Sequence, residues 1–198
     1  DESFLRVVDH SQKRDKAQLL LMPHFANYDL VSVAAARRGL TAQVLSYANP
    51  GISYRLQNRY RNELGYKFTP ISVSSLRSAL RNLEQGGTVL TGIDRPYGDF
   101  SLHPLFFGKP SNLPTGYIRF AIKSGAPLVV LQFHISSGGV CIVSATDPIS
   151  VTRDADPVQE QLINLSRVLN VVEEMIKMNP EFWFMFYPVW PDLSKDTP

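Results

Sequence analysis

The chain has 198 residues and a formal net charge of +2; 44% of its residues are hydrophobic and 19% are charged. This composition excludes a disordered chain, and the single cysteine, Cys141, excludes an intramolecular disulfide framework and a cysteine-rich zinc site. No apolar run approaches the roughly 20 residues of a membrane-spanning helix. We expect a single domain over 1–198. Because the sequence lacks an initiator methionine, we also expect an amino-terminal membrane-anchoring segment to be missing from it.

The first strong element is an apolar run, 19–22, that leads into a turn carrying His24. The run predicts a buried strand, and apolar residues at helical spacing after Asn27 predict a helix that Gly39 ends. His24 therefore lies in a strand-to-helix turn, where open α/β sheets place their ligands. The polar stretch before it, 1–16, is expected to form a helix or an arm.

Asp29 follows His24 and would lie in the first turn of this helix. We expect its carboxylate to accept a hydrogen bond from one ring nitrogen of His24, leaving the other nitrogen free as a general base. His10 and Asp15 have the same spacing, but no strand anchors them, so we interpret them as a surface pair. Spacing and context leave open that His24 is a structural histidine with satisfied hydrogen bonds.

Two further strand–helix units follow. The predicted elements are a strand over 42–47, a helix over 53–64, a strand over 67–72 and a helix from Ser74 or Ser75 to Gln85. Pro70 indicates that its strand lies at a sheet edge or ends there.

Positive charge is concentrated in this part of the chain. Between 37 and 81 there are eight basic residues and one acid, Glu63, a local charge of +7 that leaves −5 for the remaining residues. Arg55 and Arg59 lie one turn apart on one face of the predicted helix. The block predicts an anionic partner: a phosphate-bearing cofactor, an acidic carrier protein or lipid headgroups. The alternative is a set of solvated helix faces.

A second strand terminus repeats the arrangement at His24. The apolar run 88–93 predicts a strand, and Asp94 and Arg95 follow it directly. We therefore identify these two residues as a second candidate site. The alternative is an Asp-Arg-Pro turn with a surface ion pair.

The remaining elements come in a regular alternation. They are a strand over 102–107, a helix from Pro114 to Gly125, a strand over 126–133, a hairpin at Gly138 and Gly139 leading to a strand over 140–144, and a helix from Asp156 to Met178. Thr115 and Gly116 place free backbone N–H groups at a helix start, which suits a phosphate or an oxyanion. His134 follows the most apolar of these strands.

This alternation of strands and helices predicts an α/β sandwich. The hairpin argues against an all-parallel sheet. We therefore expect a mixed, mostly parallel sheet flanked by helices.

Several stretches, taken in order, resemble the bacterial lipid A biosynthesis acyltransferase family, which includes lauroyl and myristoyl transferases and relatives that acylate phosphatidylinositol mannosides. The matching stretches are the block from His24 to Asp29, Asn49-Pro50, Asp94-Arg95, 106–110, 113–116, 124–127 and 180–183. They lie within 19–190, nearly the whole chain. The resemblance implies a glycerolipid acyltransferase-like sandwich.

Three regions depart from the family pattern. The chain has Ala-Asn-Tyr-Asp over 26–29 where the family has Gly-Asn-Trp-Glu, and His134 stands where an arginine is common. Tyr187 and Val189 occupy a region in which the family often has His and Arg. These departures concern the acceptor more than the chemistry, because a histidine and an acid are retained at positions 24 and 29.

The resemblance implies transfer of a fatty acyl group from a thioester, on acyl carrier protein or coenzyme A, to a hydroxyl of a membrane lipid or glycolipid. His24 would be the general base and Asp29 its orienting acid. The implied substrate-binding residues are Asn27, Arg59, Asp94, Arg95, Thr115, Gly116 and His134. The aromatic segment 181–190 is either a core strand, the commoner arrangement, or part of an acyl-chain wall.

The implied partners are the donor thioester, the lipid acceptor and a peripheral membrane surface, at the cytoplasmic face of the bacterial inner membrane. We expect no cofactor beyond the donor, no metal and no nucleic acid. Two other functions stay open: an acyl thioesterase that uses the same dyad with water, and a catalytically silent lipid-binding relative. A serine hydrolase is disfavoured because the chain has no Gly-x-Ser-x-Gly motif.

Overall fold

The computed structural model describes residues 1–25, 28–96, 102–136 and 138–190. The helices are α1 (Glu2–Lys13), α2 (Tyr28–Arg37), α3 (Ile52–Glu63), α4 (Val73–Glu84), α5 (Gly116–Ser124) and α6 (Pro157–Met178), followed by a 3₁₀ turn, η1 (Pro180–Phe182). The strands are β1 (Gln18–Met22), β2 (Gln43–Ser46), β3 (Lys67–Pro70), β4 (Thr88–Gly92), β5 (Leu105–Phe106), β6 (Lys109–Pro110), β7 (Leu128–Ile135) and β8 (Cys141–Ala145).

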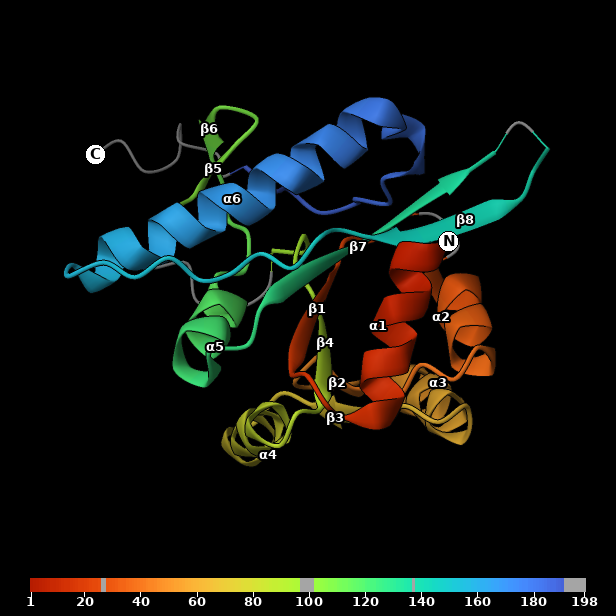
Figure 1. The fold of residues 1–198 in the computed structure, drawn as a ribbon. Helices are drawn as coiled ribbons and strands as arrows, with labels where there is room; N and C mark the ends of the chain where they lie inside the picture. The colour runs from red at the N-terminus through yellow and green to blue at the C-terminus, as the bar shows by residue number, and fades with distance from the viewer. Residues whose placement is uncertain (26–27, 97–101, 137, 191–198) are drawn as a thin grey trace.

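The main sheet has the order β3-β2-β4-β1-β7-β8 (Figure 1). All neighbours in it pair in parallel except β7 and β8, which form an antiparallel hairpin. The predicted fold, a mixed and mostly parallel sheet flanked by helices, is confirmed. Pro70 ends β3, which lies at the sheet edge, as a residue without a backbone N–H requires.

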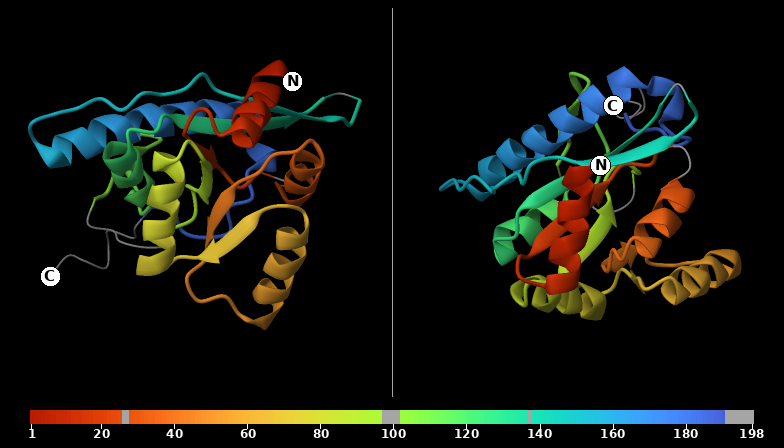
Figure 2. Two further views of the ribbon diagram at one scale, coloured as in Figure 1. Left: turned by 60° about the horizontal axis from the view of Figure 1, so that its bottom comes forward. Right: turned by 45° about the vertical axis from the view of Figure 1, so that its right-hand side comes forward.

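Helices cover both faces of this sheet. Figures 1 and 2 place α1, α2 and α3 on one face and α4, α5 and α6 on the other. The central strand β1 lies between β4 and β7, and its residues Leu19, Leu20 and Leu21 are at most 1% exposed. Strands buried on both faces are continuously apolar, which explains the run that the sequence displays.

Two predicted strands differ in the structure. The strand expected over 102–107 is reduced to β5, which pairs with β6 in a separate two-stranded hairpin. Phe107 and Gly108 turn this hairpin with positive φ angles of 49° and 71°. The strand expected to end at residue 133 continues as β7 to Ile135, so His134 lies within it and not after it.

The aromatic segment is not a core strand, because much of it lies outside the core. Phe186 is 81% exposed, and Phe184 and Tyr187 are each 41% exposed. The segment begins with η1 and then makes a single bridge, between Trp183 and Phe25. It therefore runs along the end of β1 and does not join the sheet as a further strand.

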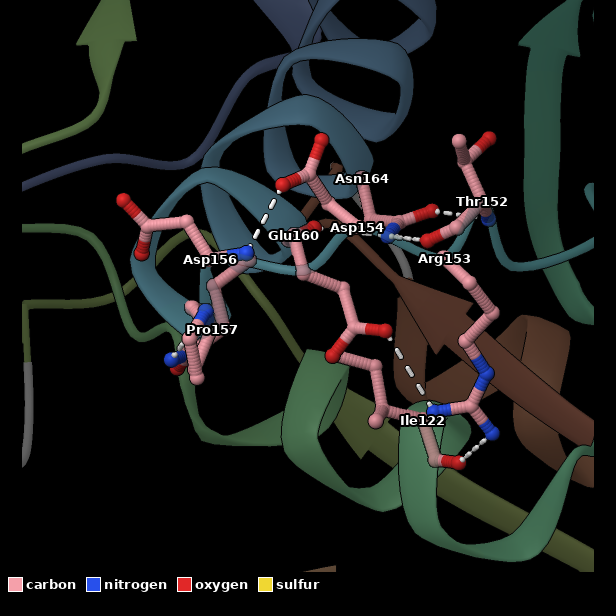
Figure 3. Close-up of polar contacts among 9 residues, drawn as sticks. Ile122, Thr152, Arg153, Asp154, Asp156, Pro157, Glu160 and Asn164 are labelled. Atoms are coloured by element: carbon pink, nitrogen blue, oxygen red, sulfur yellow. Dashed lines mark hydrogen bonds and ion pairs between the residues drawn. The ribbon is translucent and has the colours of Figure 1, made fainter.

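Polar contacts fix the start of the long helix α6 against the rest of the fold (Figure 3). Asp156 caps α6 by accepting a hydrogen bond from the backbone N–H of Val158. The buried Asn164 side chain accepts from the backbone N–H of Thr152 and donates to its carbonyl, at 2.9 and 2.8 Å. Arg153 donates to the carbonyl of Ile122 at the end of α5. These contacts join α6, α5 and the segment between them.

Among the helices of the described residues, none is long and apolar enough to cross a membrane.

Candidate active site

The register of β1 and β4 explains how the site is assembled. The two strands are adjacent and parallel, and Met22 lies opposite Gly92. His24 lies two residues after Met22, and Asp94 lies two residues after Gly92. The two residues therefore lie at the same height along the sheet. The carboxyl edge of an open α/β sheet is where such folds bind ligands. The two strand ends that the sequence singles out are therefore neighbours.

Asp94 is the acid that orients His24. Its Oδ1 lies 2.5 Å from His24 Nδ1, and its Oδ2 accepts a hydrogen bond from the His24 backbone N–H at 2.7 Å. Trp183 Nε1–H donates to the same Oδ2 at 2.9 Å. Asp94 is only 1% exposed, so these donors replace the water that its carboxylate loses. A carboxylate on Nδ1 favours the tautomer with the proton there and leaves Nε2 as the nitrogen able to accept a proton.

The imidazole ring is confined on two further sides. A Cβ atom at Gly92 would lie 2.8 Å from His24 Cε1, so only glycine leaves room for the ring at this strand position. The Tyr28 ring meets the imidazole edge-on, with centroids 5.2 Å apart. With the bond to Asp94, these contacts fix the ring orientation.

The carboxy-terminal aromatic segment completes the site. The backbone N–H of Phe184 donates to the His24 carbonyl at 2.8 Å, next to the bridge between Phe25 and Trp183. This pairing places the Trp183 indole beside Asp94. Trp183 lies in the family-like stretch 180–183, but no local pattern in the sequence connects it to Asp94, which lies 89 positions earlier.

The structure corrects the role expected of Asp29 as the residue bonded to His24. The Asp29 carboxylate pairs instead with Arg61 of α3, at 2.5 Å. The Arg61 side chain is only 11% exposed and lies over the rings of Tyr54 and Phe68. A largely buried guanidinium requires a counter-charge, and Asp29 supplies it.

Arg95 lies between two aromatic rings next to Asp94. Its guanidinium carbon is 5.9 Å from the Tyr28 ring centroid and 5.8 Å from that of Tyr187, both within cation–π range. Its Nε is buried and has no hydrogen-bond partner in the described part of the chain. A buried N–H donor without a partner is uncommon, and it is available to a ligand.

The start of α5 lies within electrostatic range of the same carboxylate. Burial, and to a smaller extent the charge of Asp94, raise the pKa of the Tyr117 hydroxyl, which therefore stays protonated at physiological pH. This hydroxyl is buried and has no hydrogen-bond partner among the described residues. Thr115 is 3% exposed and occupies the N-cap position without a side-chain capping hydrogen bond, whereas Gly116 is exposed. The first backbone N–H groups of a helix have no partner within it.

The other candidate residues lie elsewhere. Arg59 is exposed on α3, and His134 is exposed on β7 opposite Ile142. No hydrogen bond within the described residues joins either of them to His24 or Asp94. Asn27 lies outside the residues that the structure describes. In the described ranges, no group of three or more His, Cys, Asp or Glu side chains could hold a metal ion.

Comparison with known proteins adds an independent line of argument. The family model described as bacterial lipid A biosynthesis acyltransferase matches residues 5–191. Two similar curated proteins are phosphatidylinositol mannoside acyltransferases from two strains of Mycobacterium tuberculosis, 24% and 26% identical to this chain. Each match covers 89% of this chain and 56% of the relative, so the chain spans about half the length of these relatives. The chain belongs to the bacterial lipid A biosynthesis acyltransferase family.

Proposed function

We propose that this protein is an O-acyltransferase that moves a fatty acyl group from a thioester to a hydroxyl of a membrane lipid or glycolipid. The observation that carries the proposal is the hydrogen-bonded pair of His24 and buried Asp94 at the carboxyl edge of the sheet. Acyl carrier protein or coenzyme A would bear the thioester. Family membership and the names of the two mycobacterial relatives support an acyltransferase with a glycolipid acceptor.

The proposed reaction needs one base. The acceptor hydroxyl donates its proton to His24 Nε2 while its oxygen attacks the thioester carbonyl carbon. The tetrahedral intermediate then expels the thiolate, which takes the proton back from the imidazolium. Asp94 favours the protonated ring because its negative charge lies against Nδ1. Such a general base contributes about 10²–10⁴-fold in rate.

The oxyanion of the intermediate needs donors that are already in position. The buried Nε–H of Arg95 is one candidate, because it has no partner in the described residues and lies next to Asp94. The backbone N–H groups that begin α5, at Thr115 and Gly116, are the alternative, with the helix dipole aiding them. The variant Arg95→Gln distinguishes the two possibilities, because it removes the Nε–H donor and leaves the backbone N–H groups of α5 in place.

In this proposal Asp29 acts at a distance from the reaction. It joins α2 to α3 through Arg61, and α2 carries Tyr28, whose ring contacts both His24 and Arg95. Asp29 is therefore a positioning residue. The protein would work at the cytoplasmic face of the bacterial inner membrane as a peripheral protein, where its basic segment 37–81 meets anionic groups.

The test is thiol release from palmitoyl-coenzyme A, with and without lipid extract, while labelled acyl groups are followed into lipid. We expect lipid-dependent release with label in a lipid product, and loss of both in His24→Ala. Release that needs no lipid and disappears in His24→Ala would replace the proposal with a thioesterase. Equal behaviour of His24→Ala and the native protein, also with an acyl carrier protein donor, would indicate a catalytically silent relative.

A further inference from the structure

The helix α3 exposes an apolar stripe. Ile52 is 79% exposed, Leu56 68% and Tyr60 57%. These residues recur every four positions, so they lie one above the other on the same face. A stripe of three large apolar side chains in water is costly unless a partner covers it.

The opposite face of α3 is polar and buried. Asn58 is 7% exposed and Arg61 9%, and Arg61 makes its ion pair with Asp29 there. A helix on the surface of a globular protein normally does the reverse, with its apolar side toward the core and its polar side toward water. The sequence of α3 is therefore arranged for an apolar medium outside the protein.

Positive charge flanks the stripe. Arg55 and Arg59 are exposed, and each lies one turn from members of the stripe. Only one acid, Glu63, is found among the residues from 37 to 81. A helix with an apolar stripe bordered by arginines matches the composition of helices that lie in the interface of an anionic membrane.

Further large apolar side chains are exposed toward the site. Leu30 and Val73 are each 67% exposed, Tyr47 is 47% exposed and Ile71 42%. They follow β1, β2 and β3, so they lie toward the carboxyl edge of the sheet, the edge that carries His24. Figures 1 and 2 show α2 and α3 side by side.

We propose that the α3 face, formed by Ile52, Arg55, Leu56, Arg59 and Tyr60, binds the surface of membranes that contain anionic phospholipid. The inference rests on the proposed function, since it brings the catalytic edge to a lipid acceptor. An acidic carrier protein would satisfy the arginines, but it would not explain a continuous apolar stripe beside them. A membrane satisfies both, because the apolar side chains enter the acyl boundary while the arginines reach lipid phosphates.

The test is co-sedimentation with vesicles of phosphatidylcholine alone and of phosphatidylcholine mixed with phosphatidylglycerol. We expect the native chain to prefer the anionic vesicles. The double variant Ile52→Gln/Leu56→Gln should bind them at least about ten-fold more weakly. Arg55→Gln/Arg59→Gln should lose the preference for anionic lipid, by about five-fold for each arginine removed.

Two control variants match these changes on other surfaces. Val158→Gln removes an exposed apolar side chain from α6, and Lys123→Gln/Lys177→Gln removes two exposed positive charges from α5 and α6. Both controls should bind as the native chain does. Native binding that is absent, or that Ile52→Gln/Leu56→Gln leaves unchanged, would overturn the inference and indicate that a carrier or another protein covers the face. Equal loss in the controls would also overturn it.

A further variant separates the two proposals. His24→Ala should bind vesicles like the native chain and lose acyl transfer. Lipid-dependent transfer without vesicle binding would refute the membrane face and leave the proposed function intact. Vesicle binding through α3 without any reaction that depends on His24 would refute the proposed function and leave the membrane face intact.

Discussion

Asp94, which hydrogen-bonds His24, and Asp29, which follows His24 by five residues in sequence, have different surroundings. Asp94 is 1% exposed and accepts hydrogen bonds from the backbone and ring of His24 and from Trp183. The Asp29 side chain is 57% exposed and pairs with Arg61. The difference shows that closeness in sequence did not select the partner of His24. The register of β1 and β4 selected it, because this register places Asp94, at the end of the neighbouring strand, beside His24.

The largest effect that would follow from this comparison is that of Asp94→Asn. The amide cannot provide the charge that stabilises the imidazolium and favours the wrong tautomer, so kcat should fall about 10³–10⁴-fold. Steady-state kinetics of thiol release would measure it. The control is Asp15→Asn, which alters the surface pair that Asp15 makes with His10 at 2.9 Å and should leave kcat unchanged. An active Asp94→Asn enzyme would remove Asp94 from the mechanism.

The next largest effect is expected from Gly92→Ala. The added methyl group would lie 2.8 Å from His24 Cε1 and would push the ring out of line with its substrate. A displacement of this size can lower kcat about 100-fold. Gly51→Ala, where an added Cβ meets nothing within 4 Å, is the matched control. Native kinetics for Gly92→Ala would mean that the ring position is not critical.

Trp183→Phe keeps the ring but removes the N–H that donates to Asp94 Oδ2. Loss of a hydrogen bond to a charged group costs about 1.5–3 kcal/mol, which we expect to appear partly as a ten-fold loss of kcat and partly as reduced stability. Steady-state kinetics would measure the loss of kcat, and thermal unfolding would measure the loss of stability. If neither changes, the Trp183 bond is dispensable and the carboxy-terminal segment serves another purpose.

The smallest change in activity is expected from Asp29→Asn. The variant leaves Arg61 without its counter-charge, but Asp29 is more than half exposed, so the free energy of unfolding should fall by about 1 kcal/mol. The fall in kcat should stay below about ten-fold, since Asp29 acts only through α2. Chemical denaturation and kinetics would test both values. A loss of kcat equal to that of Asp94→Asn, with unchanged stability, would reverse the assignment of the two aspartates.

Much of this site could be read from the sequence, because short apolar runs ending at polar residues mark the carboxyl ends of buried strands. His24, Asp94 and Arg95 were all identified in this way. Their pairing could not be read, since the position of β4 beside β1 depends on packing of the whole sheet. A local pattern, Asp29 in the first helical turn, was a misleading guide because the long-range partner Arg61 competes for that carboxylate.

The same limits apply to the fold. Elements with strong periodicity, such as β1 and α6, were predicted closely. The aromatic segment 181–190 was expected to favour the core because aromatic side chains usually do. Its residues pair with the end of β1 instead, and Phe186 remains 81% exposed. Composition alone does not distinguish an aromatic segment that fills a core from one that borders a site.

The contact between the aromatic segment and the end of β1 also has a consequence for biosynthesis. His24 and Asp94 are translated before Trp183 and Phe184, whose contacts complete the site. The complete site thus depends on contacts between residues far apart in the chain, which form late in folding. A nascent chain that still holds residue 184 inside the ribosome would have its sheet strands but an unfinished site. The appearance of activity during synthesis would therefore report that the aromatic segment 181–190 has docked.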